Sequence, residues 1–192
     1  MGDAVRRARA LEARRLALLN SGQLKAGQAA AESAMAQHGL PPEQTARRLD
    51  MLIYRNYLAG RPAQAVPFAE RALGFWRALH ATRSVVRGRT MLGTLFGMLG
   101  DLDRALAELD AARMLAAVSG LSEQQREATL NLVTVALHRG QARRVLALLG
   151  ELDSQPQTYT WRHRQLGFML VRHAAHVHLG ELGIASTLAD EA

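Results

Sequence analysis

Residues 92–112 read LGTLFGMLGDLDRALAELDAA, and this stretch decides the fold. Its central Gly100 follows a helical stretch, and glycine ends a helix readily because it accepts left-handed backbone angles. Asp101 directly after it is typical of a helix N-cap. The small residue Ala105 then lets two helices approach closely. The stretch therefore predicts a helix, a tight turn and a second helix.

The same turn recurs along the chain at a nearly constant interval. The glycines at these turns are separated by 38, 40, 40 and 40 residues along the chain. A fixed period of this length is the signature of a repeat architecture. The glycines are Gly22, Gly60, Gly100, Gly140 and Gly180, and the residues five positions later are Gly27, Ala65, Ala105, Val145 and Ala185.

The composition supports an entirely helical chain. Ala, Leu and Arg together account for 88 of the 192 residues, and these three residue types favour helices. Val and Ile together number only 12, too few for sheets that favour β-branched residues. These numbers argue against a β-sandwich, a β-barrel and a Rossmann fold.

With these motifs the chain resembles the tetratricopeptide repeat (TPR) family, whose units carry Leu-Gly-x2-Tyr in the first helix and Ala-x3-Phe in the second. The 40-residue period is similar to the long-period variety found in bacterial regulators, while a HEAT or armadillo solenoid, with a comparable period, is the alternative. The resemblance implies an all-α, right-handed superhelical solenoid of about five antiparallel helix-turn-helix repeats. The matching residues are Leu52, Gly60, Ala65 and Ala72 in the second unit; Leu92, Gly93, Phe96, Gly100, Ala105, Leu109 and Ala112 in the third; and Leu132, Gly140 and Leu149 in the fourth.

We expect one repeat domain over residues 1–192, with repeats at about 4–38, 42–80, 82–120, 122–155 and 158–192. Pro41 and Pro42 suit the start of a helix, and Ser122-x-x-Gln125 has the form of a capping box. Pro67 predicts a kink or a late helix start, because proline removes a helical hydrogen bond.

The resemblance further implies that the first helix of each repeat lines a concave groove that binds a protein or peptide. On a helical wheel, one stripe of each first helix points away from the second helices and is polar where a buried face would be apolar. We expect Asn131 to pair with a peptide backbone, and Arg83 and Arg87 with its carboxylates, so the partner is expected to be acidic. The alternative is a solvated face without a ligand. The candidate groove residues are Arg47, Asp50, Tyr54, Tyr57, Arg83, Arg87, Thr90, Thr94, Glu127, Asn131, Thr134 and His138.

Other functional classes find little support in the sequence. The net charge is +7, and five arginines lie between Glu70 and Asp101 without an acid, but no helix-turn-helix or aromatic platform points to nucleic acid. His173 and His176 are three residues apart without a carboxylate partner, so no metal site is expected. There is no cysteine, no Gly-x-Ser-x-Gly elbow and no phosphate-binding Gly-rich loop. We therefore expect no enzymatic activity and no cofactor.

We expect the chain to be cytoplasmic, since it shows neither a signal peptide nor a stretch apolar enough to span a bilayer. The resemblance and the abundance of Arg and Ala imply a bacterial source. A second hypothesis makes it the sensory or regulatory TPR portion of a larger bacterial signalling protein, such as a transcription activator or a diguanylate cyclase. A third is formation of a homo-oligomer through the C-terminal repeat, because exposed apolar ends of solenoids invite stacking. The residues available for such stacking are Phe168, Met169, Val171, Val177, Leu179 and Ile184.

Overall fold

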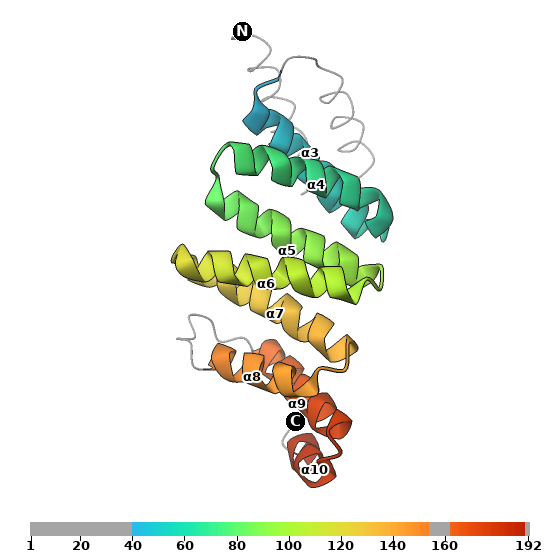
Figure 1. Ribbon diagram of the computed structural model, residues 1–192. Coiled ribbons are helices and arrows are strands. Elements are labelled where there is room, and N and C mark those ends of the chain that lie inside the picture. Colours follow the sequence, from blue (N-terminus) through green and yellow to red (C-terminus); the bar gives the residue numbers. More distant parts are fainter. Residues whose placement is uncertain (1–39, 154–161, 191–192) are drawn as a thin grey trace. The chain divides into compact units, whose positions relative to one another are not determined.

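The computed structural model describes residues 40–153 and 162–190, and within these ranges it contains helices and no strand (Figure 1). The all-α prediction is confirmed. The predicted first repeat, at about 4–38, lies outside the described residues. The helices are α3 (Pro42–Leu58), α4 (Pro62–Ala78), α5 (Thr82–Met98), α6 (Leu102–Val118), α7 (Ser122–His138), α8 (Ala142–Asp153), α9 (Arg162–His178) and α10 (Leu182–Asp190).

These helices begin at intervals of 20 residues, from Pro42 to Leu182. A full-length helix has 17 residues, and a three-residue turn completes the interval. The middle residue of each described turn has a positive φ, as at Gly100 (φ 78°). There the backbone N–H of Asp101 donates to the carbonyl oxygen of Phe96 at 3.0 Å, which satisfies a carbonyl of the ending helix. The left-handed turn residues are Gly60, His80, Gly100, Gly120, Gly140 and Gly180.

The turns therefore repeat twice in each 40-residue period. The turns expected at Gly60, Gly100, Gly140 and Gly180 are confirmed. Those at His80 and Gly120, which join one helical hairpin to the next, have the same backbone geometry. The turns within hairpins and the turns between hairpins therefore have the same backbone conformation.

Two compact units divide between Gly88 and Arg89, inside α5. In the first unit, α3 packs against α4. Leu49 of α3 is buried there, and three alanines of α4 with at most 2% exposure leave room for the two helices to approach. Gly88 of α5 belongs to the same unit, and a Cβ at this position would lie 3.3 Å from Leu73 Cδ1. The three alanines are Ala65, Ala69 and Ala72.

The second unit holds the remainder of α5 and the helices α6 to α10. Each of the helices α6 to α9 packs against the helix that follows it. Large apolar side chains with 0% exposure form its core, and they come from four successive helices. Within the described residues no helix has the length and apolar character needed to cross a membrane. The core side chains are Leu95, Leu109, Leu132, Val145 and Leu149.

Prolines and polar caps set some of the helix starts. α3 begins at Pro42, as predicted. α4 begins at Pro62 and includes Pro67, so the late start predicted from Pro67 is wrong. Proline is tolerated in the first turn, where the backbone N–H has no helical partner, and this favours the earlier start at Pro62.

The two predicted polar caps differ in outcome. Asp101 precedes α6, and its carboxylate accepts a hydrogen bond from the backbone N–H of Arg104 at 3.3 Å, as the sequence predicts. Ser122 does not cap α7, because it is already the first residue of that helix. The N-cap is Leu121, which has no capping side chain. The capping-box prediction is therefore wrong, because Ser122 lies one residue after the N-cap position.

Candidate functional site

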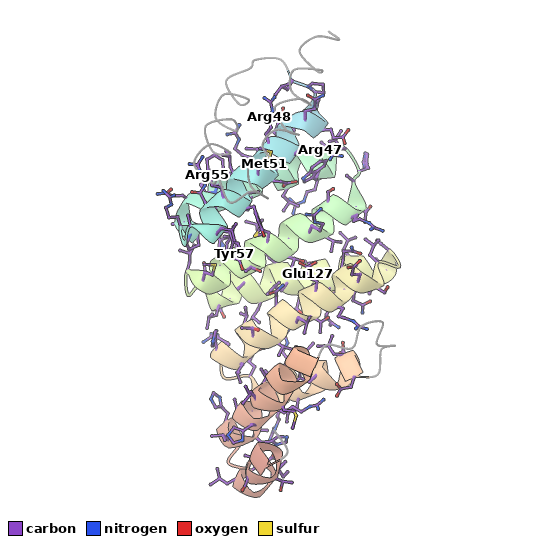
Figure 2. The ribbon with its side chains drawn as sticks, turned by 180° about the vertical axis from the view of Figure 1, so that it is seen from behind. Arg47, Arg48, Met51, Arg55, Tyr57 and Glu127 are labelled. Carbon is purple, nitrogen blue, oxygen red and sulfur yellow. The ribbon has the colours of Figure 1, made fainter. Side chains whose placement is uncertain are left out.

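The first unit brings six of the predicted groove residues onto two helices. Arg47, Arg83 and Arg87 are exposed, Asp50 and Tyr57 are half-buried, and Tyr54 has 53% of its surface exposed. The rings of Tyr54 and Tyr57 lie 6.3 Å apart, centroid to centroid. We call Arg47, Asp50, Arg83 and Arg87 the basic face of the first unit. Figure 2 shows Arg47 and Tyr57 projecting from α3.

Asp50 is the acidic residue of this basic face. The indole Nε1–H of Trp76, in α4, donates to Asp50 Oδ2 at 3.1 Å and fixes the carboxylate. Burial raises the pKa of the Asp50 carboxyl above its ordinary value, while the Trp76 hydrogen bond and the positive charges of Arg87 and Arg47 oppose this rise. Two guanidinium groups from different helices thus act on one half-buried carboxylate. Trp76 is 26 residues away from Asp50 in sequence, so the periodicity of α3 gives no sign of this contact.

The three arginines of the basic face differ in their partners. Arg47 pairs with Glu43 one helical turn earlier, at 2.9 Å, and both side chains are 57% exposed. Arg83 and Arg87 form no ion pair within the described part of the chain. Their guanidinium groups therefore present hydrogen-bond donors to solvent, in the fork geometry that suits carboxylates.

The excess positive charge of the protein belongs to the first unit. Residues 1–88 contain 14 Lys and Arg against 6 Asp and Glu, a net charge of +8, whereas residues 89–192 contain 10 against 11, a net charge of −1. Much of the charge of the second unit is also paired internally, for example between Arg89 and Glu108 at 2.7 Å. Other pairs between helices or turns there include Arg113–Glu151, Arg139–Asp103, Arg144–Asp110 and Arg172–Asp153.

The predicted groove residues of the second unit are mostly bonded to their own helices. Thr90 is 5% exposed, so its predicted place on an accessible face is wrong. The Thr94 hydroxyl donates to the carbonyl oxygen of Thr90 at 2.9 Å, and Asn131 Nδ2 donates to that of Glu127 at 3.1 Å. The Thr134 hydroxyl makes the same kind of bond at 3.3 Å. These local bonds compete with any bond to a peptide backbone.

Glu127 and His138 remain exposed on α7 (Figure 2 labels Glu127). Both belong to the polar stripe that the helical wheel predicts for this helix. The accessible stripe of the second unit therefore differs in charge from the basic face of the first, because it carries an acid where α5 carries Arg87.

Buried polar residues on α3 are a second feature that the helical periodicity does not predict. Arg48 is 8% exposed, and Asn56 is 3% exposed with its Nδ2 donating to the carbonyl oxygen of Leu52 at 2.9 Å. Forty and eighty residues after Arg48 stand Gly88 and Ala128, so α3 carries an arginine where α5 and α7 carry small residues. Comparing equivalent positions of these repeats would therefore have identified Arg48 as unusual. Arg48 and Arg55 are drawn on α3 in Figure 2.

The histidines of the last hairpin take part in contacts within it. His173 Nδ1 lies 2.8 Å from the carbonyl oxygen of Ala185, and His176 Nδ1 lies 2.6 Å from Glu181 Oε2. Both contacts join α9 to α10 or to the turn between them. No group of three or more His, Cys, Asp or Glu side chains that could hold a metal ion occurs among the described residues.

No protein-family model matches the sequence, and a search of curated proteins finds no significant match. Solved structures do match. BtubC (BKLC) from P. vanneervenii superimposes with a TM-score of 0.79 at 14% identity, over 99% of this chain and 81% of that one. A Podosopora anserina protein described as a kinesin light chain with nearly identical TPR-like repeats gives 0.77 at 15% identity, over 99% and 94% of the two chains. The apo form of RapI gives 0.74 at 11% identity, over 93% and 50%.

These likenesses concern the fold. TPR-like repeats are the architecture of the matched kinesin light chain structure, and TM-scores well above 0.5 over nearly the whole chain show that this protein has the same fold. The predicted TPR-like fold is therefore confirmed. Because one fold hosts many unrelated functions, the function has to be argued from the side chains of the site.

Proposed function

We propose that the protein is a non-enzymatic interaction module that binds an acidic peptide or an acidic segment of a protein on the basic face of the first unit. The observation that carries this proposal is the state of Arg83 and Arg87. Both are exposed on α5, and neither forms an ion pair within the described residues. Repeat proteins of this kind present extended surfaces on their first helices, which gives such arginines a place in recognition.

The spacing of the two arginines suits a ligand with two acidic groups. Residues four apart on a helix lie on one face, about 5–6 Å apart at their Cβ atoms. Each guanidinium can accept a carboxylate in a bidentate hydrogen-bonded pair, which is stronger and more directional than a contact with lysine. The net charge of +8 on residues 1–88 would also speed the approach of an anionic partner.

The test compares two double variants of the full chain. Peptides are selected from a random twelve-residue display library on the wild-type protein, and the affinity of the best peptide is measured by calorimetry. We expect enrichment of Asp and Glu, and a loss of about tenfold or more in affinity for Arg83→Ala/Arg87→Ala, since each charged hydrogen bond contributes more than about 1 kcal/mol. The control is Arg71→Ala/Arg77→Ala, which removes the same charge from exposed positions of α4.

Equal affinities of the two double variants would show that net charge, and not the basic face, attracts the peptide. A short DNA duplex is titrated in parallel at moderate salt. If the duplex binds more tightly than the peptides and depends on Arg83 and Arg87, the partner is nucleic acid and the peptide proposal is wrong. Circular dichroism and thermal unfolding of each variant check that the fold is retained.

A second candidate function is self-association through the last hairpin. Ala142 and Leu182 are the first residues of α8 and α10 and occupy the same place in the repeat. Ala142 is 3% exposed in a helix that packs on α9, whereas Leu182 is 66% exposed. Of the residues predicted for stacking, Ile184 is 51% and Val177 42% exposed, and the side chain of Phe168 lies outside the described residues.

Light scattering tests this candidate. The wild-type chain should give a mass near twice 21.0 kDa at micromolar concentration, and Leu182→Glu should return it to the monomer mass. Met114→Glu, at another exposed apolar position (64% exposed), is the control and should leave the mass unchanged. A wild-type mass of about 21.0 kDa would exclude a stable dimer.

A further inference from the structure

We infer that the Asp50 carboxylate competes with the anionic ligand for Arg87 and Arg47. Its negative charge offsets part of their positive charge, and so weakens anion binding until Asp50 is protonated or removed. This inference rests on the proposed function of the basic face. It assigns to Asp50 a regulatory effect on affinity, in place of a direct contact with the ligand.

One carboxylate acts on two of the arginines that the ligand would need. Asp50 is on α3, one turn after Arg47, and Arg87 acts on it from α5. From α4, Trp76 holds Asp50 Oδ2 by a hydrogen bond of 3.1 Å, so the carboxylate is not free to swing into solvent. Trp76 is itself 6% exposed and anchored in the core. A fixed acid of this kind stays beside the arginines whether or not a ligand is present.

The register of the repeats marks Asp50 as a special feature of the first unit. Forty residues later, the equivalent position of α5 is Thr90, and eighty residues later that of α7 is Leu130. A neutral residue therefore suits this position of the fold, and packing alone does not require the acid. The indole Nε1–H of Trp76 gives the acid a hydrogen-bond donor, while position 116, forty residues after Trp76, is alanine.

Protonation of Asp50 would remove the competition. Burial keeps the pKa of this carboxyl above its ordinary value, so it gains a proton at higher pH than a solvated aspartate does. The positive charges that act on it are those of Arg87 on α5 and Arg47 on α3, and Arg47 is also paired with Glu43. Protonation of Asp50 at lower pH therefore raises the formal charge of the basic face, which has three arginines and one carboxylate, from +2 to +3, and this favours an anion.

The experiment uses a hexapeptide of cysteic acid as the probe, because its sulfonates stay ionised from about pH 4 to pH 7, whereas carboxylates near pKa 4 do not. Binding to the full-length chain is measured by calorimetry across this range. At pH 7 we expect Asp50→Asn to bind roughly fivefold more tightly than wild type, the effect of one partly solvated charge. Glu70→Gln, on the exposed surface of α4, loses the same charge and should bind within about twofold of wild type.

The pH series supplies a second readout. The wild-type affinity should approach that of Asp50→Asn as the pH falls, since the two proteins differ only at position 50. If Asp50→Asn does not fold, Asp50→Thr takes its place, with the residue that α5 carries at this position. If Arg83→Ala/Arg87→Ala abolishes binding of the probe but Asp50→Asn leaves its affinity unchanged, this inference is wrong while the proposed function stands. Absence of wild-type binding to the probe would overturn the proposed function, and this inference with it.

Discussion

Gly93 in α5 lies so close to α6 that a Cβ atom at position 93 would stand 2.5 Å from Leu109 Cγ and 3.1 Å from the carbonyl oxygen of Ala105. Leu109 is fully buried, and the carbonyl belongs to the backbone, so neither neighbour can move aside without disturbing the core. The absence of a side chain at Gly93 therefore sets the distance between the two helices of this hairpin.

Gly93→Ala should destabilise the protein. Alanine favours the helix by about 1 kcal/mol over glycine, but forcing a methyl group into a filled core costs about 1–3 kcal/mol. We expect a net loss of roughly 1 kcal/mol and a lower melting temperature in thermal unfolding. Gly74→Ala is the matched control in α4, where a Cβ meets nothing within 4 Å. That variant should gain stability, and a similar gain for Gly93→Ala would contradict the close packing.

His80→Gly should stabilise the protein. His80 has a φ of 51° in the turn between α4 and α5, where the other described turns have glycine. The left-handed conformation costs an L-residue about 1–2 kcal/mol, and glycine avoids most of this cost while losing more entropy on folding. We expect a net gain of about 0.5–1 kcal/mol in the free energy of unfolding, measured in urea.

Gly100→Ala tests the same turn geometry in the opposite direction. A Cβ at Gly100 meets nothing within 4 Å, and its φ is 78°, so any cost comes from the backbone alone. We expect a loss of about 1–2 kcal/mol. If His80→Gly lowered stability while Gly100→Ala did too, the histidine side chain would have to make a stabilising contact of its own.

The regular part of the fold could be predicted from the sequence because glycine at a left-handed turn is hard to replace. Gly60, Gly100 and Gly140 mark three turns that the structure confirms. The expected repeat bounds also end near the turns between hairpins, but the matching geometry of these turns was not predicted, because one of them carries His80 and only its φ shows that a histidine takes the place of glycine there. A search at half the period would have found Gly120, which follows Gly100 by 20 residues.

The candidate site was harder to predict, since a helical wheel gives the phase of a side chain but not its neighbours. The wheel placed Arg83 and Arg87 on an accessible face, where they are exposed. It placed Thr90 on the same stripe, although that residue is buried. The partnership of Asp50 with Trp76 joins two helices, and helix-packing distances cannot be read from the periodicity of either one.

Asp50→Asn should change how stability depends on pH. Because burial raises the pKa of Asp50 in the folded state, the folded protein binds this proton more tightly than the unfolded chain does. The stabilising effect is fully present below the unfolded pKa of about 3.9, and it is lost as the pH rises through the folded value. The asparagine variant lacks this effect and can still accept the Trp76 hydrogen bond.

The measurement is urea unfolding of both proteins from about pH 3.5 to pH 7, in steps that bracket the ordinary carboxyl range. We expect the free energy of unfolding of wild type, minus that of the variant, to fall as the pH rises. A difference that rises with pH would mean that the charged carboxylate is the stabilised form, contrary to the effect of burial.

Asp101→Ala should lower the stability of the protein more than Ser122→Ala, because only Asp101 caps a helix with its side chain. The Asp101 carboxylate accepts from the backbone N–H of Arg104 at 3.3 Å at the start of α6, and it also stands where the positive end of the helix dipole favours an acid. Its loss should cost about 0.5–1 kcal/mol. Ser122 is already the first residue of α7, whose N-cap Leu121 makes no side-chain bond, so Ser122→Ala should change stability by less than about 0.5 kcal/mol. Thermal and urea unfolding of the two variants at neutral pH provide the comparison, and a larger loss for Ser122→Ala would restore the capping box that the sequence predicts.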